Sequence, residues 1–439
     1  MRQQRNLRLS AGVVLACLLA SLPVSTSARA ADVGAPAQVT YTDIPIQETG
    51  RVEAVLDGDT FRFMEDGAST WVKIRLLGVN TPEVTGFNNI HFAENMCGGQ
   101  EALRLLNGII PKGTRVQLRA NSKDSSNRGR SLRYVFALNQ ATGQYDIDVQ
   151  EAIARSGLAM WFTIDTESAL SYPYRLIVGE AQRAGRGIWD PDHCGPREQP
   201  AANITLTVSW DAPGIDQQNL NGEFVIVRNS GANDADLSGW LLRDSSLTSW
   251  FYFPAGTILA PNDYRVVHVG SGSPGSPSLR DLYMNSSEPL FPNTQDGRFI
   301  GDGAYLLDRR TAVRSFDEYP CITTCTDPLE HIVLITNVKA TAVSRIPTRA
   351  ANEEYIRLTN TGGTEVLLDG YYLRRQVSTY PFPPNTRILP GATLTVRIGR
   401  GAPSPTVQYW GRTSTLLSDR HDTVDLLSNQ NVLISRKRW

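Results

Sequence analysis

The chain has 439 residues, more than one ordinary hydrophobic core supports, so two to four domains are expected. Hydrophobic residues make up 41% and charged residues 20%, as in globular proteins, and 36 glycines with 25 prolines favour a turn-rich, mainly β architecture. The formal net charge is −1, and no segment beyond residue 30 is long and apolar enough to span a bilayer, which excludes a helical membrane protein.

The first 30 residues predict an export signal rather than a part of the fold. A positively charged start is followed by an apolar run over Leu9–Val24 and by Ala-Arg-Ala, a cleavage signal, at 28–30. A lipoprotein signal at Cys17 is the alternative. A membrane anchor is disfavoured because the apolar run is short and contains Pro23. We expect cleavage near Ala30 and a secreted, extracellular protein.

Cleavage at this point leaves four cysteines, an even number that suggests disulfides in an exported chain. Four cysteines allow three pairings. Cys97 and Cys194 bracket one segment, and Cys321 and Cys325 are close neighbours, so we expect the pairs Cys97–Cys194 and Cys321–Cys325. A metal site is the alternative, disfavoured because His193 is the only histidine beside any of these cysteines.

The next segment gathers carboxylates and an arginine at short spacing. Asp-Gly-Asp-Thr at 57–60 is followed by Arg75 and by Asn-Thr-Pro-Glu at 80–83. Hard cations bind oxygen ligands, a guanidinium binds phosphate through paired hydrogen bonds, and a carboxylate can activate a water molecule. The segment therefore holds the groups needed to bind a cation and a phosphate and to direct a water molecule.

Two later motifs complete a recognisable pattern. Asn-Arg-Gly-Arg-Ser-Leu-Arg-Tyr at 127–134 adds a second arginine, Arg130, and Ala-Gly-Arg-Gly-Ile-Trp at 184–189 ends a helical segment. Together with 57–83, these motifs resemble the staphylococcal nuclease (thermonuclease) family, from about residue 50 to 191. We place the corresponding domain at 45–196.

Periodicity in this domain predicts short strands and interspersed helices. The predicted strands are 51–56, 60–63, 72–76, 115–120 and 132–138, and the predicted helices are 99–107, 148–156 and 174–184. Five strands with helices fit the oligonucleotide-binding (OB) β-barrel that the family shows. Barrels of this type bind nucleic acid across one face.

The resemblance implies a calcium site at Asp59, Asn80 and Thr81, with Asp57 supporting these ligands. An ordinary Asp-Gly turn is the alternative for Asp57 and Asp59. Asn80 departs from the family pattern, in which an aspartate commonly precedes Thr-Pro-Glu. An asparagine offers a carbonyl oxygen without a charge, so we expect weaker cation binding.

The resemblance also implies three catalytic residues. Glu83 corresponds to the general base, and Arg75 and Arg130 correspond to the phosphate-binding arginines, whose forks match phosphate oxygens and stabilise developing charge. Taken alone, Glu83 could be a helix-start residue after Thr-Pro, and Arg75 a surface strand residue.

A basic run predicts contacts with the nucleic acid backbone. Between residues 112 and 133 there are seven basic residues and one acidic residue. The alternative is an ordinary solvent-exposed surface. Contact with the nucleic acid backbone would instead make nucleic acid binding fall steeply with salt concentration. Candidate contacts are Lys123, Arg128, Arg133 and Trp161. Arg128 stands where the family often has an aromatic residue, and Trp161 could stack on bases or pack in the core.

Beyond a short polar linker at 198–202, the chain contains an internal repeat. Residues 223–231 match 354–362, and 237–242 match 368–373, both at an offset of 131 residues. Alternating apolar runs separated by turn signals predict an antiparallel β-sandwich for each copy.

The repeated pattern Asn-Gly-Glu-Phe-Val, then Leu-Ser-Gly-Trp, then Phe-Pro-x-Gly-Thr resembles the lamin tail domain, which has an immunoglobulin-like fold. The copies are expected at 203–328 and 331–439. The second departs more from the pattern, with Arg375 where the first copy has Asp244 and Tyr371 where it has Trp240. This resemblance supplies no chemistry.

Charge separates the two copies. Residues 197–330 hold nine basic and seventeen acidic residues, a net charge of −8, whereas 331–439 hold fourteen and seven, a net charge of +7. Docking between the copies, polyanion binding by the second, and ordinary solvated faces all fit this asymmetry. Basic residues at 420 and 436–438 favour contact of the second copy with nucleic acid or an envelope polyanion.

The sequence therefore predicts a multidomain, mainly β protein, in which an OB-type barrel with helices precedes two immunoglobulin-like sandwiches. The predicted function is that of a secreted, calcium-dependent endonuclease acting on DNA and RNA and leaving 3′-phosphate ends. Two alternatives remain: a secreted nucleic-acid-binding protein with weak catalysis, and a surface adhesion protein that acts through its sandwiches.

Overall fold

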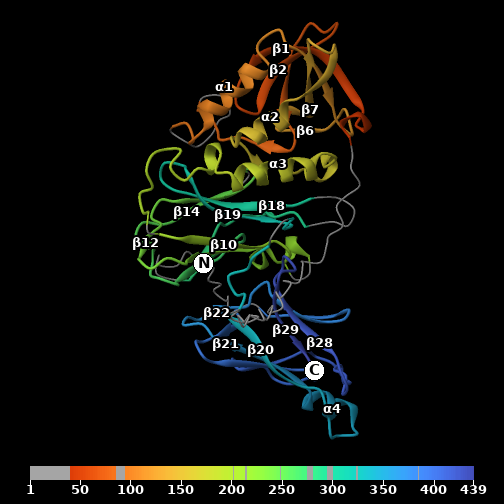
Figure 1. Ribbon diagram of the computed structural model, residues 1–439, viewed down its shortest axis with the longest axis vertical. Helices are drawn as coiled ribbons and strands as arrows, with labels where there is room; N and C mark the ends of the chain where they lie inside the picture. Colours follow the sequence, from red (N-terminus) through yellow and green to blue (C-terminus); the bar gives the residue numbers. More distant parts are fainter. Residues whose placement is uncertain are drawn as a thin grey trace, which may run out of the picture.

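The computed structural model describes residues 40–85, 94–200, 202–212, 215–247, 249–273, 280–293, 300–322, 325–383 and 385–439. The predicted export signal at 1–30 lies outside these ranges. A helix-bearing barrel and two β-sandwiches follow one another along the long axis of the molecule (Figure 1). No helix in the described ranges has the length and apolar character needed to cross a membrane.

The barrel is built on five strands. They are β1 (Ile46–Val55), β2 (Thr60–Glu65), β3 (Val72–Leu76), β5 (Arg115–Arg119) and β7 (Arg130–Asn139). Antiparallel pairing runs in the order β3-β2-β1-β5-β7, and a parallel pairing of β3 with β7 closes the barrel. This register sets Arg75 opposite Thr60 on one side and Leu132 on the other, at the closure point.

Helices cover the barrel and bury apolar faces against it. They are α1 (Gly99–Ile109), α2 (Val149–Ser156) and α3 (Ser171–Arg183), accompanied by the short strands β4 (Val79–Asn80), β6 (Ser126–Asn127), β8 (Gln144–Asp148) and β9 (Met160–Trp161). Three short 3-10 helices lie at Tyr41–Asp43, Asp165–Glu167 and Gly187–Trp189. The predicted strands and helices of this domain are confirmed to within a few residues.

The first sandwich packs two four-stranded sheets. One contains β10 (Ile204–Ser209), β11 (Phe224–Asn229), β16 (Tyr264–His268) and β17 (Asp281–Tyr283), and the other contains β14 (Trp250–Tyr252), β13 (Leu241–Asp244), β18 (Asp302–Leu307) and β19 (Val313–Tyr319). Between them, β12 (Ala235–Asp236) pairs with β15 (Ile258–Leu259). Two 3-10 helices lie at Asp216–Gln218 and Leu220–Gly222.

The second sandwich repeats this arrangement. Its sheets are β20 (Val333–Lys339), β21 (Tyr355–Asn360), β26 (Thr393–Arg397) and β27 (Val407–Tyr409), and β24 (Ser378–Pro381), β23 (Tyr372–Arg375), β28 (Thr423–Leu427) and β29 (Leu433–Arg438). A small pair joins β22 (Val366–Leu367) to β25 (Arg387–Ile388), and α4 (Pro347–Glu353) precedes β21. The predicted mainly β, multidomain fold is confirmed, and the sequence repeat is a repeat of strand order.

The barrel and the first sandwich share a continuous apolar interface. Residues of β13, β18 and β19 belong to the same buried cluster as the helices of the barrel domain, and the Trp189 ring lies 5.0 Å from that of Phe316. Beside it, Arg175 of α3 forms a 2.8 Å ion pair with Glu318, both almost fully buried. These contacts make the two domains one packed unit.

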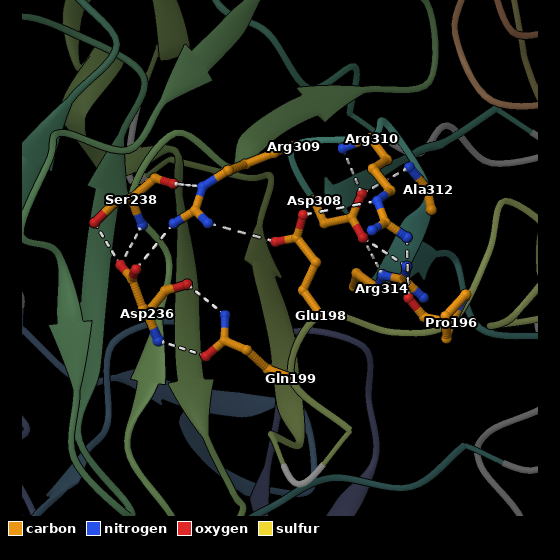
Figure 2. A network of polar contacts seen from close by, with 10 residues as sticks. All are labelled: Pro196, Glu198, Gln199, Asp236, Ser238, Asp308, Arg309, Arg310, Ala312 and Arg314. Atoms are coloured by element: carbon orange, nitrogen blue, oxygen red, sulfur yellow. Dashed lines mark hydrogen bonds and ion pairs between the residues drawn. The ribbon is translucent and has the colours of Figure 1, made fainter.

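The segment expected as a short polar linker makes polar contacts with the first sandwich. Figure 2 shows Gln199 exchanging two hydrogen bonds with the backbone of Asp236, at 2.6 and 2.8 Å. Glu198 lies 3.5 Å from Arg309 and 3.9 Å from Arg310, and Arg310 donates to the Pro196 carbonyl. The chain therefore crosses between the domains along a fixed path.

The expected cysteine pairs are both at disulfide distance. Cys97 is paired with Cys194 and Cys321 with Cys325, each with Cα atoms 5.9 Å apart. The first pair joins the segment before α1 to the segment after the 3-10 helix Gly187–Trp189, so it closes the barrel domain around its helices.

The two sandwiches also contact each other. Asn429 donates to the Val208 carbonyl, and Gln430 donates to the Asp317 carboxylate at 2.9 Å. On another side, Arg387 of the second sandwich donates to the Tyr264 hydroxyl of the first. These polar links form a second domain junction, remote in sequence from the first.

Candidate active site

Two carboxylates occupy the turn between β1 and β2. The amides of Leu56 and Asp57 both donate to the Thr60 carbonyl, at 2.9 and 3.1 Å, which closes the turn. Asp57 and Asp59 are 1% and 3% exposed. Gly58 is required between them, because a Cβ there would lie 2.5 Å from the Ala102 Cβ on α1.

Asp59 joins this turn to the end of β4. Its carboxylate accepts the Thr81 amide at 3.0 Å and the Thr60 hydroxyl at 2.9 Å. The same carboxylate forms a 3.1 Å ion pair with Arg75. Asp59 and Thr81, both predicted as metal ligands, are thus brought together.

Arg75 lies at the centre of the cluster and is 5% exposed. Its Nη1 donates to the carbonyls of Leu76 and Val79, at 2.7 and 2.8 Å, and its Nη2 donates to Asn80 Oδ1 at 2.6 Å. The guanidinium also lies 5.3 Å from the centre of the Phe162 ring. The guanidinium plane is therefore fixed, with Asp59 and Asn80 on its Nη2 side.

Arg130 approaches the same place from the start of β7. Its Nη1 lies 3.5 Å from the Thr60 hydroxyl, and the residue is half-buried. Burial and the positive charge of Arg75 lower the pKa of Arg130. Two cations held together in this way favour an anion between them.

Glu83 completes the set from the loop after β4 and is half-buried. Its backbone is fixed because its carbonyl accepts the Met96 amide, and a Cβ at Gly99 would lie 2.6 Å from that carbonyl. Burial and the Asp59 carboxylate raise the pKa of Glu83. Burial, Asp59 and Glu83 likewise raise the pKa of Asp57, whose side chain interacts with that of Glu83.

The oxygen donors and the charge of this cluster suit a hard divalent cation. Asp57, Asp59 and Glu83 bring three carboxylates close enough to interact: burial is the main cause of the raised pKa of Asp57, and the charges of Asp59 and Glu83 add to it. Within the described ranges, no three Asp, Glu, His or Cys side chains are arranged as a metal cage. The ligand set predicted from the sequence differs from such a cage, because it combines the Asp59 carboxylate with the Asn80 amide and the Thr81 carbonyl.

Two predicted nucleic acid contacts are wrong. Arg133 is 1% exposed and forms a bidentate pair with Glu48, with both N–O distances 2.7 Å. Trp161 is 0% exposed, and its indole donates to the Ser171 carbonyl at 3.1 Å. Both side chains belong to the interior, so neither reaches a bound strand. Lys123 and Arg128 are exposed, and their roles stay predictions.

A neighbour from the first sandwich was not predicted. Asn80 Nδ2 donates to the Ser245 carbonyl at 2.5 Å, across 165 residues of sequence. Arg243, two residues earlier, is 1% exposed and acts electrostatically on Glu83. The one local signal of this contact is Asn80 itself, because an aspartate there could not donate to a carbonyl.

Comparison with protein families assigns both parts of the chain. The model described as Lamin Tail Domain matches residues 199–319 and 333–439, together more than half of the chain. The model described as Staphylococcal nuclease homologue matches 73–191, which includes Arg75, Glu83 and Arg130 and begins after Asp59. A comparison with curated proteins found no match. The chain therefore belongs to the lamin tail domain family and carries a staphylococcal nuclease homologue domain ahead of its two lamin tail domains.

Proposed function

We propose that this protein is a secreted, calcium-dependent endonuclease that hydrolyses phosphodiester bonds of DNA and RNA and leaves 3′-phosphate ends. The observation that carries the proposal is the convergence of Arg75, Arg130 and Glu83 beside Asp59, in a domain that matches staphylococcal nuclease homologues. A nuclease needs both phosphate recognition and water activation, and this cluster offers both.

The two arginines define the phosphate position. A phosphate between Arg75 and Arg130 would receive N–H donors from two sides and relieve the repulsion that depresses the pKa of Arg130. Both groups keep their charge as the phosphate becomes more negative during attack. Their contribution is therefore larger in the transition state than in the ground state.

Glu83 has the properties of a general base. Its raised pKa makes the carboxylate a better proton acceptor than a solvent-exposed glutamate. In the proposed step, a Glu83 oxygen takes a proton from water, the water oxygen bonds to phosphorus, and the bond from phosphorus to the 5′-oxygen breaks. The leaving alkoxide takes a proton from water, and the phosphate stays on the 3′-oxygen.

Asp59, Asn80 and the Thr81 carbonyl are the residues that would hold calcium. When bound, the ion would neutralise charge on the phosphate and lower the pKa of a water molecule beside it. Asn80 supplies an uncharged oxygen that Arg75 already occupies with a hydrogen bond. We therefore expect weaker calcium binding than an aspartate at this position would give.

The test is cleavage of a single-stranded oligodeoxynucleotide by the mature protein, in calcium and in chelator, alongside Glu83→Gln. We expect calcium-dependent cleavage that falls by about 10²–10⁴-fold in the variant, the typical contribution of a general base. Wild-type cleavage that persists in Glu83→Gln would remove the assigned base. Absence of cleavage by the wild type at saturating calcium would remove the nuclease function.

One observation favours the competing function of a nucleic-acid-binding protein without hydrolysis. Asn80, the position usually charged in the family, is engaged at both ends of its amide by Arg75 and Ser245. Salt-sensitive oligonucleotide binding with no cleavage would support that reading. The adhesion alternative rests on the sandwiches alone and predicts protein retained on cells rather than in the medium.

Export is part of the proposal and is supported by the cysteines. Two close cysteine pairs suit an oxidising compartment. The lamin tail domains are proposed to hold the enzyme on a substrate or an envelope polyanion, with the positively charged second copy as the contact. Fractionation of culture medium and cells tests the location.

A further inference from the structure

The edge of the candidate active site that carries Asn80 is formed jointly with the first lamin tail domain. The Ser245 carbonyl accepts from Asn80 Nδ2 at 2.5 Å and from Arg243 Nη2 at 3.0 Å. One backbone oxygen therefore fixes a side chain from each domain. The opposite end of the Asn80 amide holds Arg75, so the chain of contacts runs from the sandwich to the central arginine.

Arg243 is an unusual buried cation. It is 1% exposed; its Nε donates to the Asp244 carbonyl at 2.8 Å, and its Nη1 is buried without a hydrogen-bond partner. Within the described ranges, no carboxylate lies within 4 Å of this guanidinium to form an ion pair. A buried cation without a close counter-charge is costly unless a neighbouring charge or a ligand compensates it.

Three carboxylates act on Arg243 electrostatically: Asp244 first, then Glu83, and more weakly Asp302. Asp244 follows Arg243 directly in β13, so its side chain points to the other face of the strand, where it accepts the Ser246 hydroxyl. Glu83 comes from the nuclease domain. It is the proposed general base, and Arg243 is a cation of the neighbouring domain close enough to interact with it electrostatically.

The second sandwich provides an internal comparison. Arg374 occupies the equivalent position, and its cross-strand neighbour on β28 is Asp425, with which it forms a 3.4 Å ion pair. The cross-strand neighbour of Arg243 on β18 is Tyr305. The first copy thus has a tyrosine at the cross-strand position where the second copy has the carboxylate that pairs with the arginine, and it is the copy that lies against the nuclease site.

We propose that the first lamin tail domain completes the nuclease site, with the Ser245 carbonyl as the anchor of Asn80 and Arg243, held by the same carbonyl, as a third cation beside the site. This inference rests on the proposed function for its role in turnover. Arg243 adds to the positive potential of Arg75 and Arg130 at the phosphate and is a positioning residue rather than a group shown to touch the substrate.

The packing between the domains keeps this arrangement in place. The shared apolar cluster, the Arg175–Glu318 pair and the bonds of Glu198 and Gln199 in Figure 2 hold the sandwich against the barrel. Cys97, beside α1, also donates its amide to the Thr311 hydroxyl of the sandwich at 2.7 Å. A cation carried by this sandwich is therefore as fixed as one carried by the barrel.

The test compares Arg243→Gln with Arg243→Lys in the full chain, cleaving a single-stranded oligodeoxynucleotide in calcium. Glutamine can still donate to the neighbouring carbonyls but carries no charge, whereas lysine keeps the charge. We expect Arg243→Gln to lower kcat by about 10²-fold with little change in KM, and Arg243→Lys to recover most of the loss. Arg374→Gln, the matched change in the second sandwich, is expected to leave kcat unchanged.

Two outcomes would contradict a role for the Arg243 charge in turnover. Wild-type kcat in Arg243→Gln, or equal losses in the glutamine and lysine variants, would overturn it. If the wild type does not cleave the oligonucleotide, the proposed nuclease function is wrong. The inference about Arg243 is then tested by comparing oligonucleotide binding by Arg243→Gln and by Arg243→Lys. Weaker binding by Arg243→Gln than by Arg243→Lys would then support the inference, and equal binding would overturn it.

The anchor is tested without activity, by hydrogen exchange of Asn80→Asp in chelator. A carboxylate opposite the Ser245 carbonyl would repel it, so we expect amides of 241–250 to exchange several-fold faster than in the wild type. Asn429→Asp, which removes the similar bond to the Val208 carbonyl at the other junction, should leave 241–250 unchanged. Unchanged exchange in Asn80→Asp would overturn the anchor, and this arm remains decisive if Arg243→Gln does not fold.

Discussion

Two arginines, 58 positions apart, show how partners rather than residue type decide a role. Arg75 and Arg133 are both buried, and both donate to backbone carbonyls. Arg133 is neutralised in bidentate fashion by Glu48. Arg75 shares Asp59 with a cluster that also contains Glu83 and Arg130, so its charge stays available to an anion.

Loss of the Arg133 charge should therefore act on stability. Arg133→Gln leaves Glu48 buried and unpaired, and we expect the free energy of unfolding of the barrel domain to fall by about 3–5 kcal/mol. Chemical denaturation measures this change. Arg128→Gln, at an exposed site nearby, should show the reverse pattern of unchanged stability and weaker oligonucleotide binding. Weaker binding by a fully stable Arg133→Gln would contradict the structural role.

At this scale, the sequence predicted Arg75, Glu83 and Arg130 from their motifs, and the structure places all three in one cluster; their catalytic roles stay predictions. The sequence misassigned Arg133 because β7 is a central strand buried on both faces, so alternation along the strand does not separate interior from surface. For Trp161 the sequence left base stacking and core packing open, and the structure places the side chain in the core, where its indole donates to the Ser171 carbonyl at the start of α3. Burial depends on neighbours that a single sequence position does not reveal.

At the scale of elements, α2 and α3 are joined by one carboxylate. Asp148 caps the N-terminus of α2 by accepting the Glu151 amide at 2.9 Å, and it also accepts the Tyr174 hydroxyl of α3 at 2.9 Å. Burial raises the pKa of Asp148 from 3.8 to about 6. The cap is thus also a titrating contact between two helices.

This gives a pH dependence of defined sign. Because the pKa in the folded protein lies above the ordinary value, the stabilisation from the bound proton is present below pH 4 and is lost as pH rises to 6. Asp148→Asn mimics the protonated group. The free energy of unfolding of Asp148→Asn minus that of wild type should increase by about 2 kcal/mol from pH 4 to pH 8. This increase is smaller than the full pKa shift of Asp148 implies, because its side chain keeps some contact with water.

Denaturant unfolding at several pH values measures the difference between the two proteins. Asp146→Asn, two residues away and exposed, is the control and should follow wild type. A constant difference between Asp148→Asn and wild type across this range would show that the carboxyl is ionised throughout. Helix positions in this domain were predictable because apolar periodicity is local, whereas the Asp148–Tyr174 link joins elements that the sequence does not place side by side.

At the scale of the whole molecule, the three domains are joined by two junctions of different character. The barrel meets the first sandwich through apolar packing and buried ion pairs. The sandwiches meet through a smaller apolar cluster, in which Leu367 packs with residues of β11 and β16, and through side-chain amides and Arg387 beside Tyr264 and Glu365.

The positive surface of the second sandwich should bind polyanions independently of cleavage. Arg436 is neutralised by Asp425, whereas Arg420 and Arg438 are exposed and carry no ion pair within the described ranges. Changing Arg420, Lys437 and Arg438 to glutamine should reduce the slope of log affinity for single-stranded DNA against log salt by about 2. Cleavage of a short oligonucleotide should be unchanged. An unaltered slope would assign polyanion binding elsewhere.

The order of the domains and the fold of each could be predicted from motifs and the repeat. The contact of Ser245 with Asn80 could not, because docking between domains depends on surface shape and on the fixed path of 196–199, which contains no periodic signal. The sequence did mark the position, since Asn80 is where the chain departs from its family pattern.

The difference between Tyr305 and Asp425 bears on how the two sandwiches arose and diverged. Copies of one ancestral unit begin as interchangeable, yet here the same arginine lies opposite a tyrosine in the first copy and is paired with a carboxylate in the second. Exchanging the order of the copies would present a neutralised arginine, and Arg375 in place of Asp244, to the nuclease domain. The two copies are therefore no longer equivalent, and their order along the chain decides which one contacts the nuclease domain.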